Sequence, residues 1–513
     1  MDFSLLLSSY GSVFTNLEVI LMTLIGALGG ILLGAIPGMT ATMGVALLVP
    51  FSFGMDLIPA VGLLLGIYCG GMYGGSISAI LIHTPGTPSA AATLIDGYPM
   101  TQKGQAGQAL SVAMFASFCG GVIGALIMTF ASPVIARAAM RFNSGEMFML
   151  AIFGLSVIIA ISGKSVVKGL MSGFFGMVLC TVGLDPTNGI ARFISRSQVS
   201  LYEGFAFIPA LIGMFAVAEV IAGVERIVRG EEKHLVSHEK IKRVLPDGHT
   251  IKKIWPNILS GAVIGTFVGA IPGAGGDIAV FVSYGANKSF SRHPELWGTG
   301  IPNGVASTES ANNGCSGGAM IPLLALGVPG DAVTAVLLGA FIMKGIQPGP
   351  MMYVTELPTV YGVFAALMLA NLAMLLIGCA GVRFFTKIVS VEKTILYPII
   401  LVVSLLGAFS INKNVFDVGV CVGFGVFGWL MNKYEFPLSP ILLTLILGPM
   451  CEQNFVRFMN LNHGDFTQIF HFPIAMAFLA LAVLSILYSV WNQNKINKAE
   501  AARKAAEREA ANA

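Results

Sequence analysis

The chain has 513 residues, of which 55% are hydrophobic and 11% are charged. A soluble globular protein has about 25% charged residues, so this composition leaves too little polar surface for a water-soluble fold. The net charge of +3 is small, and the sequence has no dense basic face that would neutralise nucleic-acid phosphates. It therefore predicts an all-α polytopic membrane protein that lies in a lipid bilayer and binds no nucleic acid.

Apolar runs of the length that a bilayer requires, about 20 residues, recur along almost the whole chain. In chain order we predict spans at 17–36, 57–82, 108–136, 146–162, 166–184, 204–223, 256–271, 331–347, 358–382, 394–410, 414–431, 436–450 and 472–491. Shorter apolar pieces lie at 39–53, 277–286 and 315–328. We expect 10–14 transmembrane segments.

The distribution of Lys and Arg predicts the orientation. No Lys or Arg precedes Lys103, whereas the polar stretch 225–254 is rich in both. Positive residues are retained on the cytoplasmic side, so the N-terminus should face outward and the polar stretch should be cytoplasmic. The predicted division is a first membrane repeat at 1–224, a cytoplasmic linker loop at 225–255, a second membrane repeat at 256–491 and a cytoplasmic tail at 492–513.

Two motifs occur once in each half. Residues 26–38 and 261–273 share the pattern G-x-x-x-G-x-x-x-G-A-I-P-G at an offset of 235 residues. At an offset of 244 residues, a second set of small residues and Pro-Gly recurs: Gly70, Gly74, Pro85 and Gly86 match Gly314, Gly318, Pro329 and Gly330. Glycines four apart let another backbone approach closely, and Pro-Gly ends a helix.

The halves should be inverted relative to each other, because the first begins outside and the second follows a cytoplasmic loop. Two inverted repeats, with helices or hairpins broken by Pro-Gly, are typical of secondary transporters whose site lies near the bilayer midplane. Helix N-termini at such breaks present N–H groups and partial positive charge, which suit a carboxylate. The predicted substrate-binding residues are Gly38, Thr40, Thr42, Thr84, Gly86, Thr87, Ser89, Gly273, Gly275, Gly276, Asn303, Ser307, Thr308, Gly330 and Asp331. For each single hydroxyl, capping of a local helix is the competing interpretation.

The segment 303–316, NGVASTESANNGCS, is the strongest polar patch between apolar runs. A charge inside a membrane is costly and suggests function, and carboxylate and amide oxygens suit hard cations. We predict that Asp277, Glu309, Asn312 and Asn313 bind a coupling sodium ion or hydrogen-bond the substrate. An exposed polar loop is the alternative for this segment. Sodium aside, no metal or cofactor is expected, because the seven cysteines form no C-x-x-C pair.

These motifs resemble the large permease subunit of the tripartite tricarboxylate transporter family, TctA. The resemblance rests on the two G-x-x-x-G-x-x-x-G-A-I-P-G copies, HTPGTPSAAATLIDGYPMTQKGQAGQAL from His83, GAGGDIAVFVSYGANKSFS from Gly273 and IPNGVASTESANNGCSGGAMIPLLALGVPGD from Ile301. It implies a permease of the bacterial inner membrane that works with a small membrane subunit and a periplasmic solute-binding protein. It also implies uptake of citrate or other carboxylates coupled to an ion gradient, commonly sodium.

The sequence thus predicts ion-coupled secondary active uptake of organic carboxylates such as citrate, with a periplasmic N-terminus and a cytoplasmic C-terminus. It predicts no enzyme activity. Two alternatives stay open. An intramembrane enzyme would need a triad of Ser, His and Asp, for which Ser76 and His83 are candidates, and a passive carboxylate channel would also use oxygen-lined breaks.

Overall fold

The computed structural model describes residues 2–161, 165–185, 189–195, 197–230, 245–388, 393–487 and 489–490. Within these residues the protein is helical, and one short antiparallel ladder pairs β1 (Gly183–Leu184) with β2 (Ala191–Arg192). Several helices have the length and hydropathy of membrane spans. The predicted all-α polytopic membrane fold is confirmed.

Seven of the described helical stretches are long and apolar enough to cross a membrane. They are α2 (Leu17–Ala35), α4 (Leu57–Ile82), α6 (Ala106–Ala139), the continuous stretch of α9 (Phe207–Ile212), η4 (Gly213–Val217) and α10 (Ala218–Val228), α16 (Leu357–Ile388), α17 (Lys393–Asn412) and α18 (Val415–Lys433). The shorter apolar helices are α1 (Phe3–Thr15), α7 (Ser144–Ile161), α8 (Val166–Cys180), α14 (Ala332–Met343) and Pro473–Leu487. The total of 10–14 segments stays a prediction.

The remaining helices are shorter or more polar. They are α3 (Ala41–Leu48), η1 (Pro50–Gly54), η2 (Pro88–Ala91), α5 (Leu94–Gln102), η3 (Val199–Leu201), α11 (Gly248–Gly269), α12 (Gly275–Ser289), η5 (Pro294–Leu296), α13 (Pro302–Leu326), α15 (Met352–Thr355), α19 (Ser439–Leu461) and η6 (Phe466–His471). The polar segment 303–316 is therefore helical, and it is buried from Gly304 onward. The alternative of an exposed polar loop is wrong.

The chain forms two compact units, residues 1–140 with 206–429 and residues 141–205 with 430–513. This division follows spatial contacts, whereas the predicted domains follow the sequence repetition. Helices α10 and α11 extend into both ends of the predicted linker 225–255, whose residues 231–244 lie outside the described residues. The predicted tail 492–513 also lies outside them.

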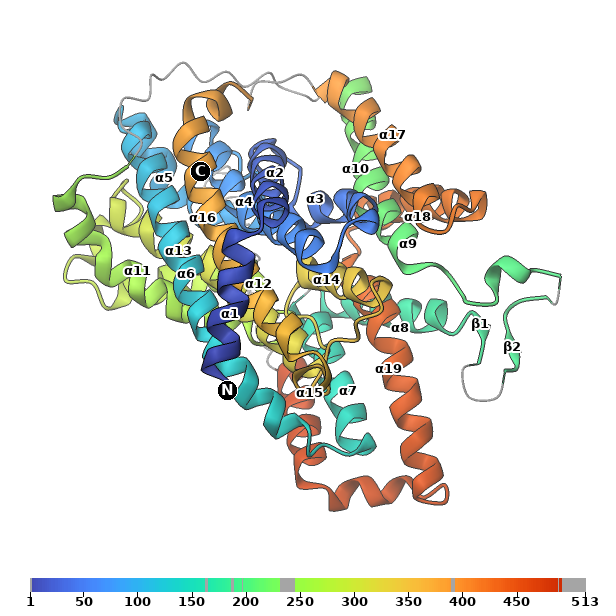
Figure 1. The fold of residues 1–513 in the computed structure, drawn as a ribbon. Helices are drawn as coiled ribbons and strands as arrows, with labels where there is room; N and C mark the ends of the chain where they lie inside the picture. The colour runs from blue at the N-terminus through green and yellow to red at the C-terminus, as the bar shows by residue number, and fades with distance from the viewer. Residues whose placement is uncertain are drawn as a thin grey trace, which may run out of the picture. The chain divides into compact units, whose positions relative to one another are not determined.

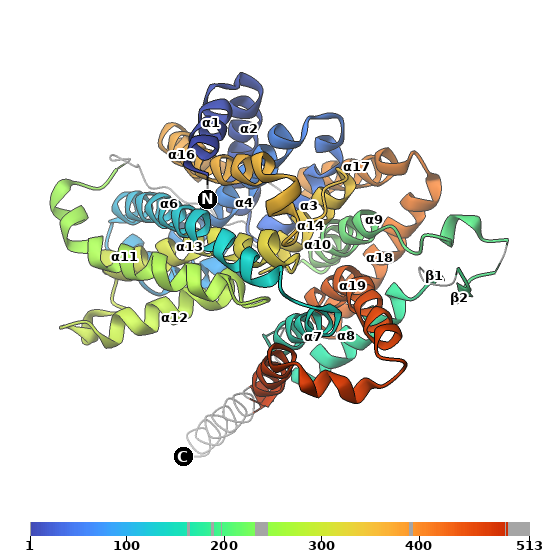
Figure 2. The ribbon, with the colours of Figure 1, turned by 60° about the horizontal axis from the view of Figure 1, so that its bottom comes forward.

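The first unit contains two closely packed helix pairs, α2 with α4 and α11 with α13. Helix α6 packs along α13 and α16 along α4, and both views show α6, α13 and α11 side by side (Figure 1, Figure 2). Glycine allows each close approach, because a Cβ would overlap a facing carbonyl oxygen. The pairs of glycine and facing residue are Gly26 and Leu63, Gly30 and Ile67, Gly34 and Gly71, then Gly261 and Ser307, Gly265 and Ala311, Gly269 and Cys315.

These two sets of contacts are equivalent position by position. The glycines correspond at the offset of 235 residues and their facing residues at 244. His83 and Gly327, also 244 residues apart, both end their helix in the left-handed conformation, with φ of 58° and 73°. The repetition seen in the sequence is therefore a repetition of helix packing, while the inversion of the repeats stays a prediction.

Two lysines join the repeats in a reciprocal way. Lys103, after α5, donates to the carbonyl oxygen of Thr299 at 2.6 Å. Lys344, after α14, donates to the carbonyl oxygens of Phe53, at 2.9 Å, and Met55. Met55 and Thr299 are 244 residues apart and the two lysines 241, so each repeat contacts the other through a lysine and a carbonyl group at similar places in the two copies.

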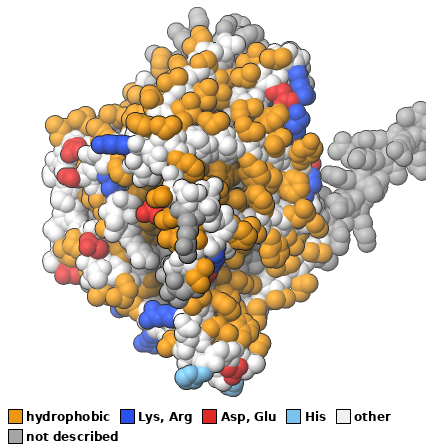
Figure 3. All heavy atoms as spheres, turned by 90° about the vertical axis from the view of Figure 1, so that its right-hand side faces the viewer, with side chains coloured by type: hydrophobic (Ala, Val, Ile, Leu, Met, Phe, Trp, Pro, Cys, Tyr) orange, Lys and Arg blue, Asp and Glu red, His pale blue; other side chains and the backbone are white. Residues whose placement is uncertain are grey.

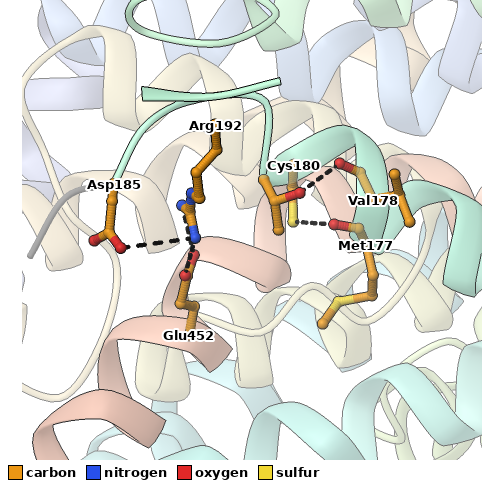
Figure 4. Close-up of polar contacts among 7 residues, drawn as sticks. Met177, Val178, Cys180, Asp185, Arg192 and Glu452 are labelled. Carbon is orange, nitrogen blue, oxygen red and sulfur yellow. Dashed lines mark hydrogen bonds and ion pairs between the residues drawn. The ribbon is translucent and has the colours of Figure 1, made fainter. Parts of the chain in front are cut away.

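The second unit is built by α7, α8 and α19. Its apolar core contains Met149, Phe458, Ile469 and Ala475. The β1–β2 hairpin is fastened to α19, because Arg192 makes an ion pair with Glu452 at 2.5 Å and lies 3.9 Å from Asp185 (Figure 4).

Hydrophobic side chains dominate the surface view in Figure 3, where charged side chains form small scattered groups. Large apolar residues on several helices are exposed, among them Leu21 on α2, Phe267 on α11 and Leu406 on α17. A soluble monomer rarely exposes such extensive apolar surface. This surface suits contact with lipid, as expected of a multi-pass membrane protein.

Candidate functional site

The Pro-Gly breaks position the polar residues of the first unit. Helix α2 ends before Gly38 and α11 before Gly273, and both glycines have positive φ, of 85° and 82°, a conformation that favours glycine. After the second break of the first repeat, η2 packs against α12 of the second repeat. The breaks therefore bring segments of both repeats together.

We call this meeting point the junction site and define it by Met72, Ser89, Gly276 and Asn312. A Cβ atom placed at Gly276 would lie 3.1 Å from Asn312 Oδ1 and 3.3 Å from both Met72 Cε and Ser89 Cβ. The Thr87 and Ser89 hydroxyls lie 3.1 Å apart. Two residues of the junction site thus come from each repeat, and a side chain at Gly276 would crowd it.

The N-terminus of α12 at the junction site has no side-chain cap. Its first residues, Gly275 and Gly276, are buried, and Gly275 has a φ of 57°. An α-helix leaves its first four N–H groups without intrahelical partners and carries partial positive charge at that end. The end of α12 therefore offers N–H groups to a ligand, while two carboxylates stand beside it: Asp277 in its first turn, and Asp331, whose Cβ would lie 3.2 Å from a Cβ at Gly275.

Asn312 supplies a second unsatisfied group. Its side chain is fully buried, and Nδ2 donates to the Met72 carbonyl oxygen at 3.4 Å. Its Oδ1 has no hydrogen-bond partner among the described residues. A buried polar atom without a partner costs about 1–3 kcal/mol, so a bound molecule that pairs with the Asn312 amide would remove that cost.

The helix N-termini at two other breaks are already capped. Asp331 accepts from the Thr334 N–H at 2.7 Å in a capping box on α14, and it also accepts from the Tyr68 O–H. Thr40 accepts from the Met43 N–H at 3.1 Å and caps α3. At Thr40 and Asp331 the side chains thus perform local capping, and the α12 end differs from both.

Glu309 lies in a cage of hydroxyl groups, which we define as Ser76, Thr93, Ser117 and Thr308. The Glu309 carboxylate is fully buried and accepts from Ser76 at 2.5 Å, from Ser117 at 2.9 Å and from Thr93. The hydroxyls of Thr93 and Thr308 lie 2.9 Å apart. The hydroxyl cage draws on α4, α6, α13 and the segment before α5, so it too combines both repeats.

The four residues predicted to hold a cation make separate contacts. Asp277 is exposed on α12, whereas Glu309, Asn312 and Asn313 are fully buried. Asn313 Nδ2 lies 3.0 Å from the sulfur of Met374, and its Oδ1 has no partner among the described residues. In that part of the chain no group of three or more His, Cys, Asp or Glu side chains is placed to hold a metal ion.

The other predicted substrate-binding residues make local or structural contacts. Backbone hydrogen bonds join Gly86 to Gly75 and Gly273 to Gly330, and side-chain bonds join Thr84 to Ile82, Asn303 to Asn257, Ser307 to Gly304 and Thr308 to Val305. Thr42 is buried in α3. Gly38 lies beside a different polar group, since its Cβ would stand 3.3 Å from Glu219, which is paired with Arg226.

Sequence reasoning missed several polar residues near these sites. Tyr68, Thr93 and Ser117 are single hydroxyls in apolar or weakly polar stretches, and no spacing distinguishes them. Asp96 had a clearer signal, a carboxylate close to the first Pro-Gly break. It is fully buried and accepts from the Tyr284 O–H at 2.8 Å and from three N–H groups of the loop at 298–301.

Comparison with known proteins assigns the family. The model of the tripartite tricarboxylate transporter TctA family matches residues 20–443. This chain belongs to the TctA family. It is therefore a multi-pass membrane permease of a tripartite transporter type, in which the large subunit works with partners.

Two relatives from Agrobacterium vitis also match this TctA-family chain. An uncharacterized 52.8 kDa protein in the TAR-I ttuC' 3'region is 36% identical over 466 residues, 91% of this chain and 92% of the relative. An uncharacterized protein in the TAR-II ttuC' 3'region is 33% identical over 226 residues, 44% of this chain and 93% of the relative. No solved structure matches the chain significantly.

Proposed function

We propose that this TctA-family chain is the permease of a sodium-coupled uptake system for organic carboxylates such as citrate. It works in the bacterial inner membrane with a small membrane subunit and a periplasmic solute-binding protein, and its N-terminus is periplasmic and its C-terminus cytoplasmic. The observation that carries the proposal is the uncapped, buried N-terminus of α12 beside Asn312, whose Oδ1 has no hydrogen-bond partner among the described residues.

A carboxylate fits this position for electrostatic reasons. The N–H groups at the start of α12 and the hydroxyl of Ser89 donate to its oxygens, and the helix end stabilises its negative charge. The unpaired Asn312 Oδ1 is an acceptor, so it orients a substrate through a hydroxyl group such as those of citrate and malate.

The proposed transport depends on the fact that both repeats contribute residues to the junction site. Met72 and Ser89 belong to the first repeat, whereas Gly276 and Asn312 belong to the second. A movement of one repeat against the other changes the distance between these donors, so that binding and release occur in different conformations. Helices broken at the site are the form that such transporters use.

The experiment is uptake of radiolabelled citrate, malate and succinate into proteoliposomes that contain the chain and its small subunit. The proposal predicts accumulation above the external concentration, and only when the binding protein and an inward sodium gradient are both present. Equilibration that ignores the gradient would show a passive channel. No flux of any of the three acids, with the partners present, would contradict the proposal.

A further inference from the structure

Asp96, on α5 of the first repeat, is a fully buried carboxylate that belongs neither to the junction site nor to the hydroxyl cage. Its Oδ1 accepts from the N–H groups of Gly298, Gly300 and Ile301 at distances of 2.8–3.0 Å. Its Oδ2 accepts from the Tyr284 O–H at 2.8 Å. We call these residues the clasp. Because hydrogen bonds to a carboxylate are roughly twice as strong as those between neutral groups, the clasp holds the loop before α13 against α5.

The backbone of this loop is shaped to receive the Asp96 carboxylate. Gly298 and Gly300 have φ of 92° and 95°, a conformation that favours glycine, and N–H groups that converge in such a turn can hold an anion. A Cβ at Gly300 would lie 2.9 Å from the Met100 nitrogen of α5, and a Cβ at Gly304 would overlap the carboxylate itself. Glycines at these positions therefore let the second repeat approach α5 as closely as the clasp requires.

The first repeat has an equivalent linker before α4, 244 residues earlier, which is held in a simpler way. Among the described residues, the hydrogen bonds between this linker and the second repeat come from Lys344, which donates to the carbonyl oxygens of Phe53 and Met55. Helix α14 precedes Lys344 as α5 precedes Lys103, but its sequence contains no Asp or Glu that could replace Asp96. One linker is thus held by a carboxylate and a lysine, and the other by a lysine alone.

The two contacts also differ in burial. Asp96 has a relative exposure of 0%, and Trp297, next to the clasp, has 5%. The Trp297 ring packs edge-on against Tyr284, with ring centroids 5.1 Å apart. Phe53 in the other linker is 40% exposed, so water competes more strongly with the Lys344 contact. Because a hydrogen bond shielded from water is stronger, opening the clasp should cost more free energy than opening the Lys344 contact.

We propose that the clasp and the Lys344 contact are two gates of unequal strength, and that the unloaded permease rests with the clasp closed and opens at the side of Lys344. Under the predicted inversion of the repeats, the two linkers lie on opposite sides of the membrane. An equilibrium between two such openings favours the one that breaks the weaker contact. The proposal rests on the proposed movement of one repeat against the other, but not on the identity of the transported molecule.

The test measures access to the junction site from each side of the membrane. Ser89→Cys, in a variant without the seven native cysteines, is labelled in right-side-out and inside-out membrane vesicles with a maleimide that does not cross the membrane. Glu295→Cys and Phe51→Cys, both at exposed positions of the two linkers, show which side each linker faces. Cys at position 89 should react at least about tenfold faster from the side of Phe51 than from the side of Glu295.

Asp96→Asn weakens the clasp, because the amide lacks the charge that strengthens the hydrogen bonds of the carboxylate. It should raise the rate of labelling from the clasp side by about tenfold. The matched control is Asp417→Asn, which changes another buried carboxylate, on α18, and should leave both rates unchanged. Hydrogen exchange gives a second measurement in protein that keeps its native cysteines. Asp96→Asn should speed the exchange of the amides at 298–301 by about tenfold and leave those at 54–57 unchanged.

The outcomes separate the gates from the transported molecule. Equal labelling from the two sides, including none from either, or faster labelling from the clasp side would overturn the proposal. So would linker cysteines that react from the same side, or an Asp96→Asn variant that leaves clasp-side labelling or the exchange at 298–301 unchanged. If the bias is present but none of the three acids accumulates in proteoliposomes, the unequal gates stand and the proposed carboxylate function fails.

Discussion

At the residue scale, the single side chain of Asp331 makes two contacts that hold the broken helices in place. It caps α14 of the second repeat and accepts a hydrogen bond from Tyr68 of the first. One carboxylate thus satisfies the end of a broken helix and ties the two repeats together. A sequence can show that an acidic residue follows Pro-Gly, but whether it binds substrate or caps its own helix depends on the partner that the fold brings to it.

We predict that Asp331→Ala lowers stability and that Asp331→Asn does so much less. Loss of an N-cap costs about 0.5–2 kcal/mol, and the amide oxygen of Asn can still accept from the Thr334 N–H. The unfolding midpoints of the two variants in detergent measure the difference. Equal midpoints for Asp331→Ala and the unmodified protein would show that the cap contributes nothing.

The need to know which partners the fold brings together also limited the prediction of cation ligands. Glu309 was identified because a charge in an apolar stretch stands out, but its partners Ser76, Thr93 and Ser117 come from three other segments. Their positions follow from the packing of α4 and α6 against α13, which no local spacing reveals. Asp277 was grouped with Glu309 by composition, and the fold leaves it exposed on α12.

At the scale of elements, the glycine motifs were the most informative part of the sequence. The repeated glycines predict close helix contacts, and the structure places each of them against a carbonyl of α4 or α13. The ends of α2, α4, α11 and α13 at Pro-Gly were also predictable. The partner of each glycine face was not, because a small-residue stripe does not specify which helix it meets.

We predict that Gly265→Ala destabilises the protein, because the added Cβ would overlap the backbone of Ala311. Backbone cannot yield as a flexible side chain does, and overpacking typically costs about 1–3 kcal/mol. Gly30→Ala, at the equivalent position of the first repeat, should behave alike. The control is Gly423→Ala on α18, where a Cβ meets nothing within 4 Å. Unfolding midpoints that fall no further than the control's would contradict this packing account.

At the scale of the whole molecule, the two repeats exchange equivalent contacts. Lys103 reaches Thr299, and Lys344 reaches Met55. The lone Lys-Gly after each break was visible in the sequence, but its carbonyl partner in the other repeat was not. The two compact units were likewise beyond sequence reasoning, since α7, α8 and α19 are far apart along the chain and meet only through tertiary packing.

Inversion of the repeats predicts that equivalent positions lie on opposite sides of the membrane. Gln102, directly before Lys103, and Gln347, three residues after Lys344, are both exposed and lie near the corresponding ends of the two repeats. Each is replaced by Cys in a variant without the seven native cysteines, and labelled in intact cells with a reagent that does not cross the membrane. Label at one position only is expected. If both cysteines are labelled in intact cells, or if neither is labelled until the cells are opened, the two repeats are parallel and the prediction of inversion is wrong.

The measurement that tests the central claim most directly is equilibrium binding of carboxylate to Gly276 variants. With citrate, or the first acid of the panel that the unmodified protein accumulates, Gly276→Ala should weaken binding by about tenfold or more, because its Cβ crowds Asn312 and Ser89. Gly285→Ala, on the same helix where a Cβ meets nothing within 4 Å, should bind like the unmodified protein. Equal affinity in the two variants would contradict a carboxylate site at the N-terminus of α12.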